Sequence, residues 1–253
     1  MSSVETRQIE IQKLLHQQGT LRVPDLAQQF HASLDTIRRD LRQMEENGLL
    51  RRIHGGAVQV SVSNGPYQSR LLELLPEKGE IARKVARDLI PNDAIVFFDS
   101  GSTILEIARH LKPSFCGMVI TVNPAVAVTL AEHPNAKIIM IGGPVLKQEM
   151  AIHGPTAMDE IRRYHADICI IGTCALHPEQ GLTASCLEER TTKAAMIAQS
   201  TEAIAVATAD KLETSLPHRV CGLDEISRLV TGRKLSSGYL QNYKNHGVEI
   251  ILA

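Results

Sequence analysis

The sequence predicts an α/β protein in two parts: an N-terminal winged helix-turn-helix domain and a larger α/β domain with a mainly parallel sheet. Residues 6–58 carry helical patterns that end in a hairpin pattern, whereas from Glu77 onward apolar strand-like runs alternate with helical patterns. Between them, QVSVSNGPYQS at 59–69 is rich in Ser, Gly and Pro and has no periodicity, as is typical of a linker. We expect domains at 1–60 and 76–253, joined by a linker at 61–75.

The first helix of the small domain is predicted over the run from Thr6 to about Gln18, and Gly19 ends it. Its apolar face consists of Ile9, Ile11, Leu14 and Leu15. A second helix starts with Pro24 in its first turn. It turns Leu26, Ala27 and Phe30 inward.

A third helix follows the turn HAS, with Ser33 as its N-cap and Asn47-Gly48 as its end. Its apolar stripe, at spacings of three and four residues, is Leu34, Ile37, Leu41 and Met44. The run LLRRIHGGAV after it alternates and contains Gly55-Gly56, which indicates a small β-hairpin. Helix, helix, turn, helix and hairpin is the layout of a winged helix-turn-helix.

Polar side chains on the third helix and the hairpin suit contact with DNA. With the apolar stripe buried, Arg39 and Arg42 project to the opposite side and Arg38 lies at the flank. The planar guanidinium fork suits guanine edges and phosphates, and the start of a recognition helix enters the major groove. The predicted DNA-binding residues are Ser33, Asp35, Thr36, Arg38, Arg39 and Arg42 on the helix, and Arg51, Arg52 and His54 on the wing. Alternatively, the arginines only pair with Asp35, Glu45 and Glu46 on a solvated face.

Composition restricts the partners and the compartment. The 253 residues carry a net charge of −1, so a polyanion must be met by a local cluster of cations. No apolar run approaches 18 residues and the N-terminus is polar, so we expect no membrane span, no secretory signal and a cytoplasmic location. The odd, scattered set Cys116, Cys169, Cys174, Cys186 and Cys221 predicts buried reduced thiols, with no disulfide framework, metal or cofactor.

The segment TIRRDLRQMEENGLLRRIHGGA resembles the signature of the DeoR family of bacterial transcriptional regulators, and the resemblance covers nearly the entire chain. It implies a winged helix-turn-helix followed by a sensor domain that is similar to sugar-phosphate isomerases. It also implies a repressor that is released by a phosphorylated sugar-type metabolite.

In the second domain, seven apolar runs predict strands: AIVFFD, MVITV, AKIIMIGG, ADICIIGT, AIAVAT, SRLVTG and VEIILA. The first of these runs ends near Asp99, and the loop Ser100-Gly101-Ser102-Thr103 leads into a helix. Backbone N–H groups at such a helix start suit a phosphate, although this composition also suits a simple helix cap. The resemblance to the family's phosphate loop favours the phosphate.

Other loops at strand ends are weaker signals, because a simple turn explains each of them. They are Asn123, the pair Gly142-Gly143, His153-Gly154 and the run from Gly172, and the resemblance favours Asn123 and the glycine pair. Glu188, Glu189 and Lys193 begin a helix, where an acidic N-terminus and a solvated lysine are an equal alternative. The resemblance favours Glu188 and Lys193. The family commonly has a run of the type Asp-His-Ser-Lys-Phe-Gly, whereas residues 208–213 of this sequence are TADKLE. Only Lys211 matches the family's run, so the effector of this protein can differ from those of the family. The predicted effector-binding residues are Asp99, Ser100, Gly101, Ser102, Thr103, Asn123, Gly142, Gly143, Glu188, Lys193 and Lys211.

Three functions follow from these features. The favoured one is a repressor of a carbohydrate or sugar-acid catabolic operon. Its partners are double-stranded operator DNA, a phosphorylated sugar or sugar-acid effector, and further copies of the chain in a dimer or tetramer. The second is a sugar-phosphate isomerase or deaminase that uses Glu188 as acid and base. The predicted DNA-binding domain argues against this function, because an enzyme gains nothing obvious from one. The third is a DNA-binding scaffold without a small-molecule input.

Overall fold

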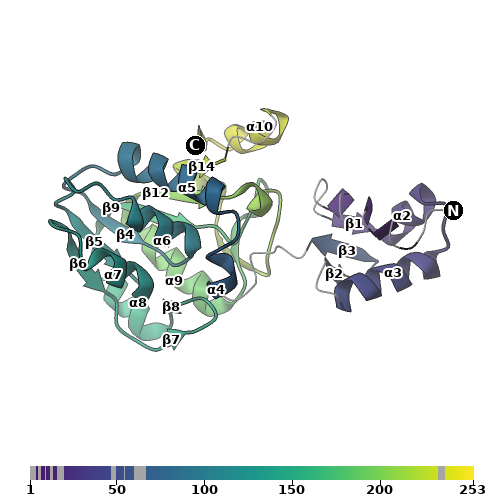
Figure 1. Cartoon of the computed structure of the whole chain (residues 1–253), viewed down its shortest axis with the longest axis horizontal. Coiled ribbons are helices and arrows are strands. Elements are labelled where there is room, and N and C mark those ends of the chain that lie inside the picture. Colours follow the sequence, from purple (N-terminus) through teal and green to yellow (C-terminus); the bar gives the residue numbers. More distant parts are fainter. Residues whose placement is uncertain are drawn as a thin grey trace. The chain divides into compact units, whose positions relative to one another are not determined.

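The computed structural model describes residues 4, 7–8, 10–11, 14–15, 20–46, 50–53, 55–59, 67–232 and 237–253. The chain divides into two compact units, 1–64 and 65–253 (Figure 1). Each unit is described by itself below. None of the helices in the described ranges has the length and apolar character that crossing a membrane requires.

Unit 1 is a winged helix-turn-helix, as predicted. The described residues 7–8, 10–11 and 14–15 of the first predicted helix are helical, and its borders lie outside the described residues. The elements that follow are β1 (Thr20–Arg22), α2 (Val23–Gln29), α3 (Leu34–Glu46), β2 (Leu50–Ile53) and β3 (Gly56–Gln59). The predicted stop of α3 at Asn47-Gly48 also lies outside the described residues.

The wing has a third strand that the sequence pattern did not predict. β1 pairs with β3 in a sheet of order β1-β3-β2, and Arg22 lies opposite Gly56. A Cβ atom at Gly56 would lie 2.1 Å from the carbonyl oxygen of Leu21, so only glycine allows this pairing. Gly55 has a φ of +79° in the turn, a conformation that favours glycine. The glycine pair therefore serves the turn and the close approach of two strands.

The core of unit 1 contains most of the predicted apolar stripe of α3. Ile37, Leu41 and Met44 are at most 1% exposed, and they pack with Ile11, Leu15 and Leu26. The prediction for Leu34 is wrong, because this side chain is 45% exposed. Leu34 is the first residue of α3, so no earlier turn of the helix lies over it.

All seven predicted strands of unit 2 form one sheet. They are β4 (Ile95–Phe98), β5 (Met118–Thr121), β6 (Lys137–Met140), β9 (Ala166–Gly172), β12 (Ser200–Ala207), β14 (Arg228–Thr231) and β15 (Glu249–Leu252). Their order is β15-β14-β12-β9-β4-β5-β6, and every neighbouring pair is parallel. The parallel sheet of the predicted fold class is confirmed.

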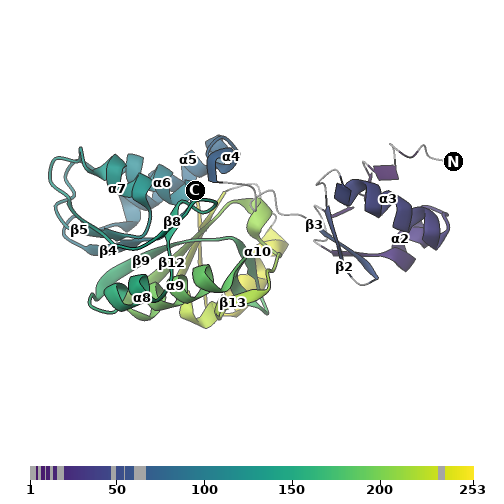
Figure 2. The same cartoon turned by 90° about the horizontal axis from the view of Figure 1, so that it is seen from below.

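Helices cover both faces of this sheet (Figure 2), which explains why its strands read as continuous apolar runs. One face carries α5 (Leu75–Lys84), continued by a π-helical turn at Val85–Leu89, together with α6 (Ser102–Arg109) and α7 (Pro124–Leu130). The other carries α8 (Pro155–Ile161), α9 (Leu187–Ala198) and α10 (Ser237–Asn245). Each face has its own apolar core.

Several short elements of unit 2 were not predicted. The strands β10 (Ala175–His177), β11 (Gly181–Ala184) and β13 (His218–Cys221) form an antiparallel sheet, and β7 (Val145–Leu146) pairs with β8 (Ala151–Ile152). Two 3-10 turns lie at Ala209–Lys211 and Leu223–Glu225. All five cysteines are free, as expected, but only Cys169 and Cys221 are buried. Cys174 and Cys186 are partly exposed, and Cys116 is exposed because it follows the turn before β5.

The helix α4 (Tyr67–Arg70) lies within the predicted linker of residues 61–75 but belongs to unit 2. Its Tyr67 side chain is 2% exposed, and the guanidinium of Arg70 donates to Glu149 Oε2 at 2.8 Å. Burial and an ion pair to a distant segment fix these residues, so the linker ends earlier than the composition suggested.

The order in which successive strands are added to the sheet changes direction between β4 and β9. From β4 the order runs outward through β5 to β6, and from β9 it runs the other way through β12, β14 and β15. Loops that leave the carboxyl ends of strands diverge at such a switch point and leave room for a ligand. Asp99 follows β4 and Thr173 follows β9, so both lie at this point.

Candidate functional site

The start of α3 is held by the predicted cap. Ser33 Oγ accepts a hydrogen bond from the Thr36 backbone N–H at 3.1 Å and also bonds the Thr36 hydroxyl at 2.8 Å. Asp35 is exposed beside them. These three predicted DNA-binding residues therefore lie together on the exposed first turn of the helix.

The charged side chains of α3 divide between its two sides. Asp40 faces inward, is 3% exposed and accepts from Arg7 Nε at 2.5 Å, which ties α3 to the first helix. Arg39 and Arg42 are exposed, and neither forms an ion pair or hydrogen bond within the described part of the chain. Arg38 instead pairs with Asp35 at 3.2 Å, as the solvated-face alternative expected for it. Among the described residues, Arg39 and Arg42 are thus the arginines of α3 without a bound partner.

The wing is joined to α3 through Arg52. Its Nε donates to Glu45 Oε2 at 2.7 Å and its backbone N–H donates to Glu45 Oε1 at 2.8 Å. These bonds lower the pKa of Glu45, so the carboxylate holds the wing against the helix. Arg51 is a residue of β2, and His54 lies outside the described residues.

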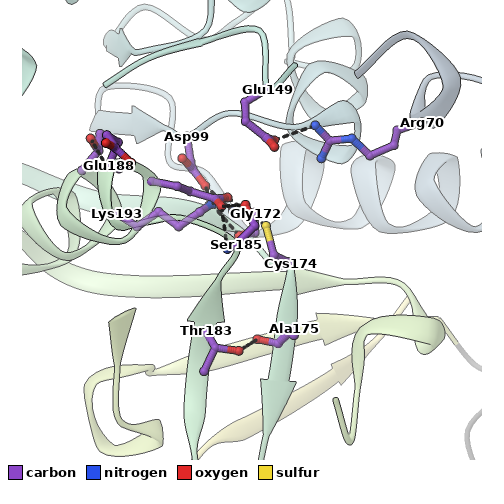
Figure 3. Close-up of polar contacts among 12 residues, drawn as sticks. Arg70, Asp99, Glu149, Gly172, Cys174, Ala175, Thr183, Ser185, Glu188 and Lys193 are labelled. Carbon is purple, nitrogen blue, oxygen red and sulfur yellow. Dashed lines mark hydrogen bonds and ion pairs between the residues drawn. The ribbon is translucent and has the colours of Figure 1, made fainter. Parts of the chain in front are cut away.

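In unit 2, a group of polar residues at the switch point forms the Asp99 cluster: the buried Asp99, Glu189 and Lys193, the partly exposed Gly172 and Cys174, and the exposed Ser185. Figure 3 shows Asp99, Gly172, Cys174, Ser185 and Lys193 of this cluster. Lys193 and Asp99 are at most 1% exposed, and the ammonium of Lys193 pairs with Asp99 Oδ2 and donates to the Gly172 carbonyl at 2.8 Å. Asp99 Oδ2 also accepts from the Gly172 N–H at 2.9 Å. Burial by itself would lower the pKa of Lys193, but the Asp99 carboxylate outweighs it and raises that pKa above its ordinary value.

The buried acid of this cluster is Glu189 and not the predicted Glu188. Glu189 is 1% exposed and lies 3.6 Å from Lys193 Nζ, and it accepts bonds from Cys174 Sγ at 2.8 Å and from Ser185. Glu188 is exposed and lies apart from the Asp99–Lys193 pair (Figure 3). Glu189 and Lys193 are four residues apart on one face of α9, whereas Glu188 starts the neighbouring face. Both carboxylate oxygens of Glu189 accept hydrogen bonds, so Glu189 is not placed as a free general base. Glu188 is not placed as one either, because it lies apart from the Asp99–Lys193 pair.

The loop after β4 has the form expected for an anion site. Gly101 has a φ of +121° and precedes α6, whose N-terminus has no side-chain cap. A Cβ atom at Gly101 would meet nothing within 4 Å. Ser100 is buried, and Ser102 and Thr103 are partly exposed. The first N–H groups of α6 therefore lack a side-chain acceptor from the cap position.

Buried polar atoms without a hydrogen-bond partner in the described part of the chain gather at this edge of the sheet. They include Asp99 Oδ1, Thr173 Oγ1 and both ring nitrogens of His153, and also Tyr67 Oη and Asn123 Nδ2, whose side chains lie against each other. Asn123 caps α7, because its Oδ1 accepts from the Ala125 N–H at 2.9 Å. Such unused groups in a native fold indicate bonds to a ligand or to solvent.

The predicted effector-binding residues Gly142, Gly143 and Lys211 lie outside the Asp99 cluster. The two glycines are exposed, and a Cβ at Gly143 would lie 2.8 Å from Cγ2 of Ile152, so this glycine provides space for β8. Lys211 pairs with Asp210 at 2.6 Å and acts electrostatically on Lys78. Lys78 is 5% exposed and donates to the carbonyls of Arg70 and Glu73 at 2.6 Å, and burial followed by Lys211 lowers its pKa to about 8.

The sequence patterns missed Tyr67 and Arg70, and they offered Glu189 and His153 without selecting them. Glu189 was signalled by its spacing of four residues from Lys193. Tyr67 and Arg70 lie in a segment whose composition resembles a linker, so no local pattern marks them. His153 follows a strand of only two residues.

A helix-turn-helix head and a parallel α/β body with a buried polar cluster at its switch point define a transcriptional regulator with a sensor domain. Residues 7–62 match the family model of the DeoR-like helix-turn-helix domain. Residues 74–233 match the family model of the DeoR C terminal sensor domain. The chain belongs to the DeoR family, as the signature segment predicted.

Relatives along the whole length agree with this assignment. The HTH-type transcriptional regulator GlpR of Haloferax volcanii is 31% identical over 90% of this chain and 90% of its own length. The glycerol-3-phosphate regulon repressor of Escherichia coli K12 is 30% identical over 95% of each chain. The transcriptional repressor GlcR of Bacillus subtilis is 29% identical over 98% of this chain and 96% of its own. Among solved structures, ribose 5-phosphate isomerase A of Methanocaldococcus jannaschii is 14% identical and covers 53% of both chains with a TM-score of 0.39.

Proposed function

We propose that this regulator represses a carbohydrate or sugar-acid catabolic operon and releases the DNA when a phosphorylated sugar or sugar acid binds at the switch point of unit 2. The observation that carries the effector site is the set of buried, unpartnered polar atoms around the Asp99 cluster, next to the uncapped N-terminus of α6. Phosphate suits that helix terminus, and sugar hydroxyls suit unused amide, imidazole and carboxylate atoms. The relatives of Bacillus subtilis and Escherichia coli are named as repressors, which supports this direction of control.

DNA is read by α3 in this proposal. The first turn with Ser33, Asp35 and Thr36 faces base edges, and Arg39 and Arg42 bind bases or phosphates. Arg38, Arg51, Arg52 and His54 add phosphate contacts along the helix flank and the wing. Operator half-sites repeat with the symmetry of the duplex, so the active form is at least a dimer. A cytoplasmic location accompanies this role.

The DNA-binding test compares a double variant, Arg39→Ala with Arg42→Ala, with the wild-type chain. Each arginine contact contributes about 1–3 kcal/mol, so operator affinity falls roughly 30-fold or more. Fluorescence anisotropy on a DNA site selected from a random pool measures this loss. The matched control is Arg162→Ala with Arg163→Ala, two arginines of unit 2 with side chains 57% and 72% exposed. Equal affinity of both double variants for the site would contradict the assignment.

The effector test is a thermal-shift screen of the full chain. A ligand that binds only the folded state raises Tm, by an amount that corresponds to about 2.7 kcal/mol at a hundred times Kd. We expect a shift with at least one phosphorylated sugar or sugar acid, and release of the bound DNA by the same compound. If the compounds that raise Tm leave DNA binding unchanged, effector binding does not control DNA binding, and the proposed release of the repressor is wrong.

A further inference from the structure

His153 is a buried ring whose nitrogens the fold does not use. It follows β8, and the Ile152 N–H donates to the Val122 carbonyl at 2.8 Å, which places this segment beside the end of β5 and next to Asn123. His153 is 6% exposed, and neither Nδ1 nor Nε2 has a hydrogen-bond partner in the described part of the chain. Leaving such groups without partners costs free energy, so a buried imidazole of this kind calls for a functional reason.

The charged groups that act electrostatically on His153 come from two elements. Asp99 acts on it from the end of β4, and Lys193, Glu189 and Glu188 act on it from α9. Burial lowers the pKa of His153, Lys193 lowers it further, and the three carboxylates act in the opposite direction. The imidazole is therefore neutral at pH 7 and offers one N–H donor and one acceptor.

The charges around the ring decide which part of a ligand fits there. Asp99 and Glu189 share a single buried ammonium, that of Lys193, which leaves one negative charge in excess. A phosphate or carboxylate beside His153 would meet this excess, whereas a hydroxyl group would not. The unused Asp99 Oδ1 accepts the hydrogen of such a hydroxyl, and the imidazole N–H donates to its oxygen. The anion belongs instead at the uncapped start of α6.

We propose that His153 binds the effector directly, at a hydroxyl-bearing carbon between its ring and Asp99, and so selects phosphorylated polyhydroxy compounds over phosphate esters that lack this hydroxyl. The inference rests on the proposed effector site and specifies its uncharged end. His153 is thereby a specificity-determining residue, and the selected feature of the ligand is one hydroxyl group.

The test uses the full chain with three variants. His153→Leu removes both nitrogens at similar size, His153→Gln keeps a donor and an acceptor, and His165→Leu is the matched control. His165 is exposed and precedes β9, so it lies at the opposite, amino edge of the sheet. The probes are glucose 6-phosphate, ribose 5-phosphate, glycerol 3-phosphate, 6-phosphogluconate and inorganic phosphate. The probe that most raises the Tm of the wild type is then studied by calorimetry with its monodeoxy analogues.

We expect His153→Leu to lower the affinity for that probe roughly 5- to 150-fold, which is the effect of one lost buried hydrogen bond. We expect His153→Gln to restore part of this affinity. One monodeoxy analogue binds the wild type and His153→Leu within about twofold of each other, because its missing hydroxyl is the one that His153 contacts. The Tm of unliganded His153→Leu does not fall, since the fold gives the ring no bond to lose.

Two results would overturn the inference and leave the effector site intact. One is a probe that binds the wild type, His153→Leu and His165→Leu equally well. The other is a fall of more than about 3 °C in the Tm of unliganded His153→Leu with unchanged probe affinity, which would make the histidine structural. If no probe raises the Tm of the wild type, the proposed effector class itself fails, and the inference falls with it.

Discussion

Replacing Lys193 by Met tests whether one ammonium holds the centre of the sensor domain together. Lys193 is 1% exposed, and its partners Asp99 and Glu189 are 0% and 1% exposed. Methionine fills a similar volume without a charge, so the variant leaves two carboxylates buried and facing each other. Breaking a buried ion pair on one side costs about 3–5 kcal/mol. For a domain of 150–250 residues this corresponds to a fall in Tm of roughly 6–20 °C.

Urea unfolding followed by circular dichroism measures the free energy of unfolding, and a rescue variant separates charge from packing. Adding Asp99→Asn and Glu189→Gln to Lys193→Met neutralises the whole cluster, and we expect stability within about 2 kcal/mol of the wild type. Lys84→Met is the control, because Lys84 makes an exposed pair with Asp88 at 2.8 Å. Such a pair contributes about 0–1 kcal/mol.

Two outcomes would refute this reasoning. If Lys193→Met costs no more than Lys84→Met, the buried ammonium does not stabilise the cluster. If the triple variant is as unstable as Lys193→Met alone, the loss comes from packing or from the hydrogen bond to the Gly172 carbonyl, and not from unpaired carboxylates.

Three further variants test other parts of the structure. Gly172→Ala places a Cβ 2.6 Å from the Ser100 carbonyl oxygen, so we expect a loss of about 1–3 kcal/mol in urea unfolding and weaker effector binding; an unchanged value of both contradicts the close approach. Ser33→Ala removes the cap of α3 and lowers the stability of unit 1 by about 1 kcal/mol, seen as a fall in its Tm, whereas an unchanged Tm would dismiss the cap. The lowered folded pKa of His153 means that the unfolded chain binds the proton more readily, so the wild type loses stability relative to His153→Leu as pH falls from about 7 to 5. Parallel Tm curves of the two proteins over this range would refute that sign.

The seven strands and the helices α2, α3, α6 and α9 could be predicted because each carries a periodic pattern long enough to fix its type. β1, with three residues, and β7 and β8, with two each, could not. A segment this short has no period of its own, and pairing with a partner strand decides its conformation. The same holds for Tyr67–Arg70, where burial overrides a composition that is typical of a linker.

The candidate site shows the same limit at the level of single residues. The strand-to-helix loop at Asp99 could be located, because a Ser/Gly-rich turn between an apolar strand pattern and a helical pattern is visible in the sequence. The strand order that puts this loop at a switch point came only from the structure. Choosing between Glu188 and Glu189 required the direction of each side chain on α9. The helical spacing to Lys193 contained this information, since only the residue four positions away shares its face. The bonds to Cys174 and Ser185 depend on β10 and β11, so they are tertiary and left no trace in the spacing.

The contacts of α4 join the start of unit 2 to the proposed effector site. The Tyr67 N–H donates to the Gln148 carbonyl at 2.9 Å, Arg70 pairs with Glu149, and Lys78 donates to the carbonyl of Arg70. The Tyr67 side chain also faces Asn123, which carries one of the unused donors of the effector site. A ligand that draws on Asn123 therefore acts on α4, the first described element of unit 2. Such a ligand shifts DNA binding only by the difference in its affinity for two arrangements of α4.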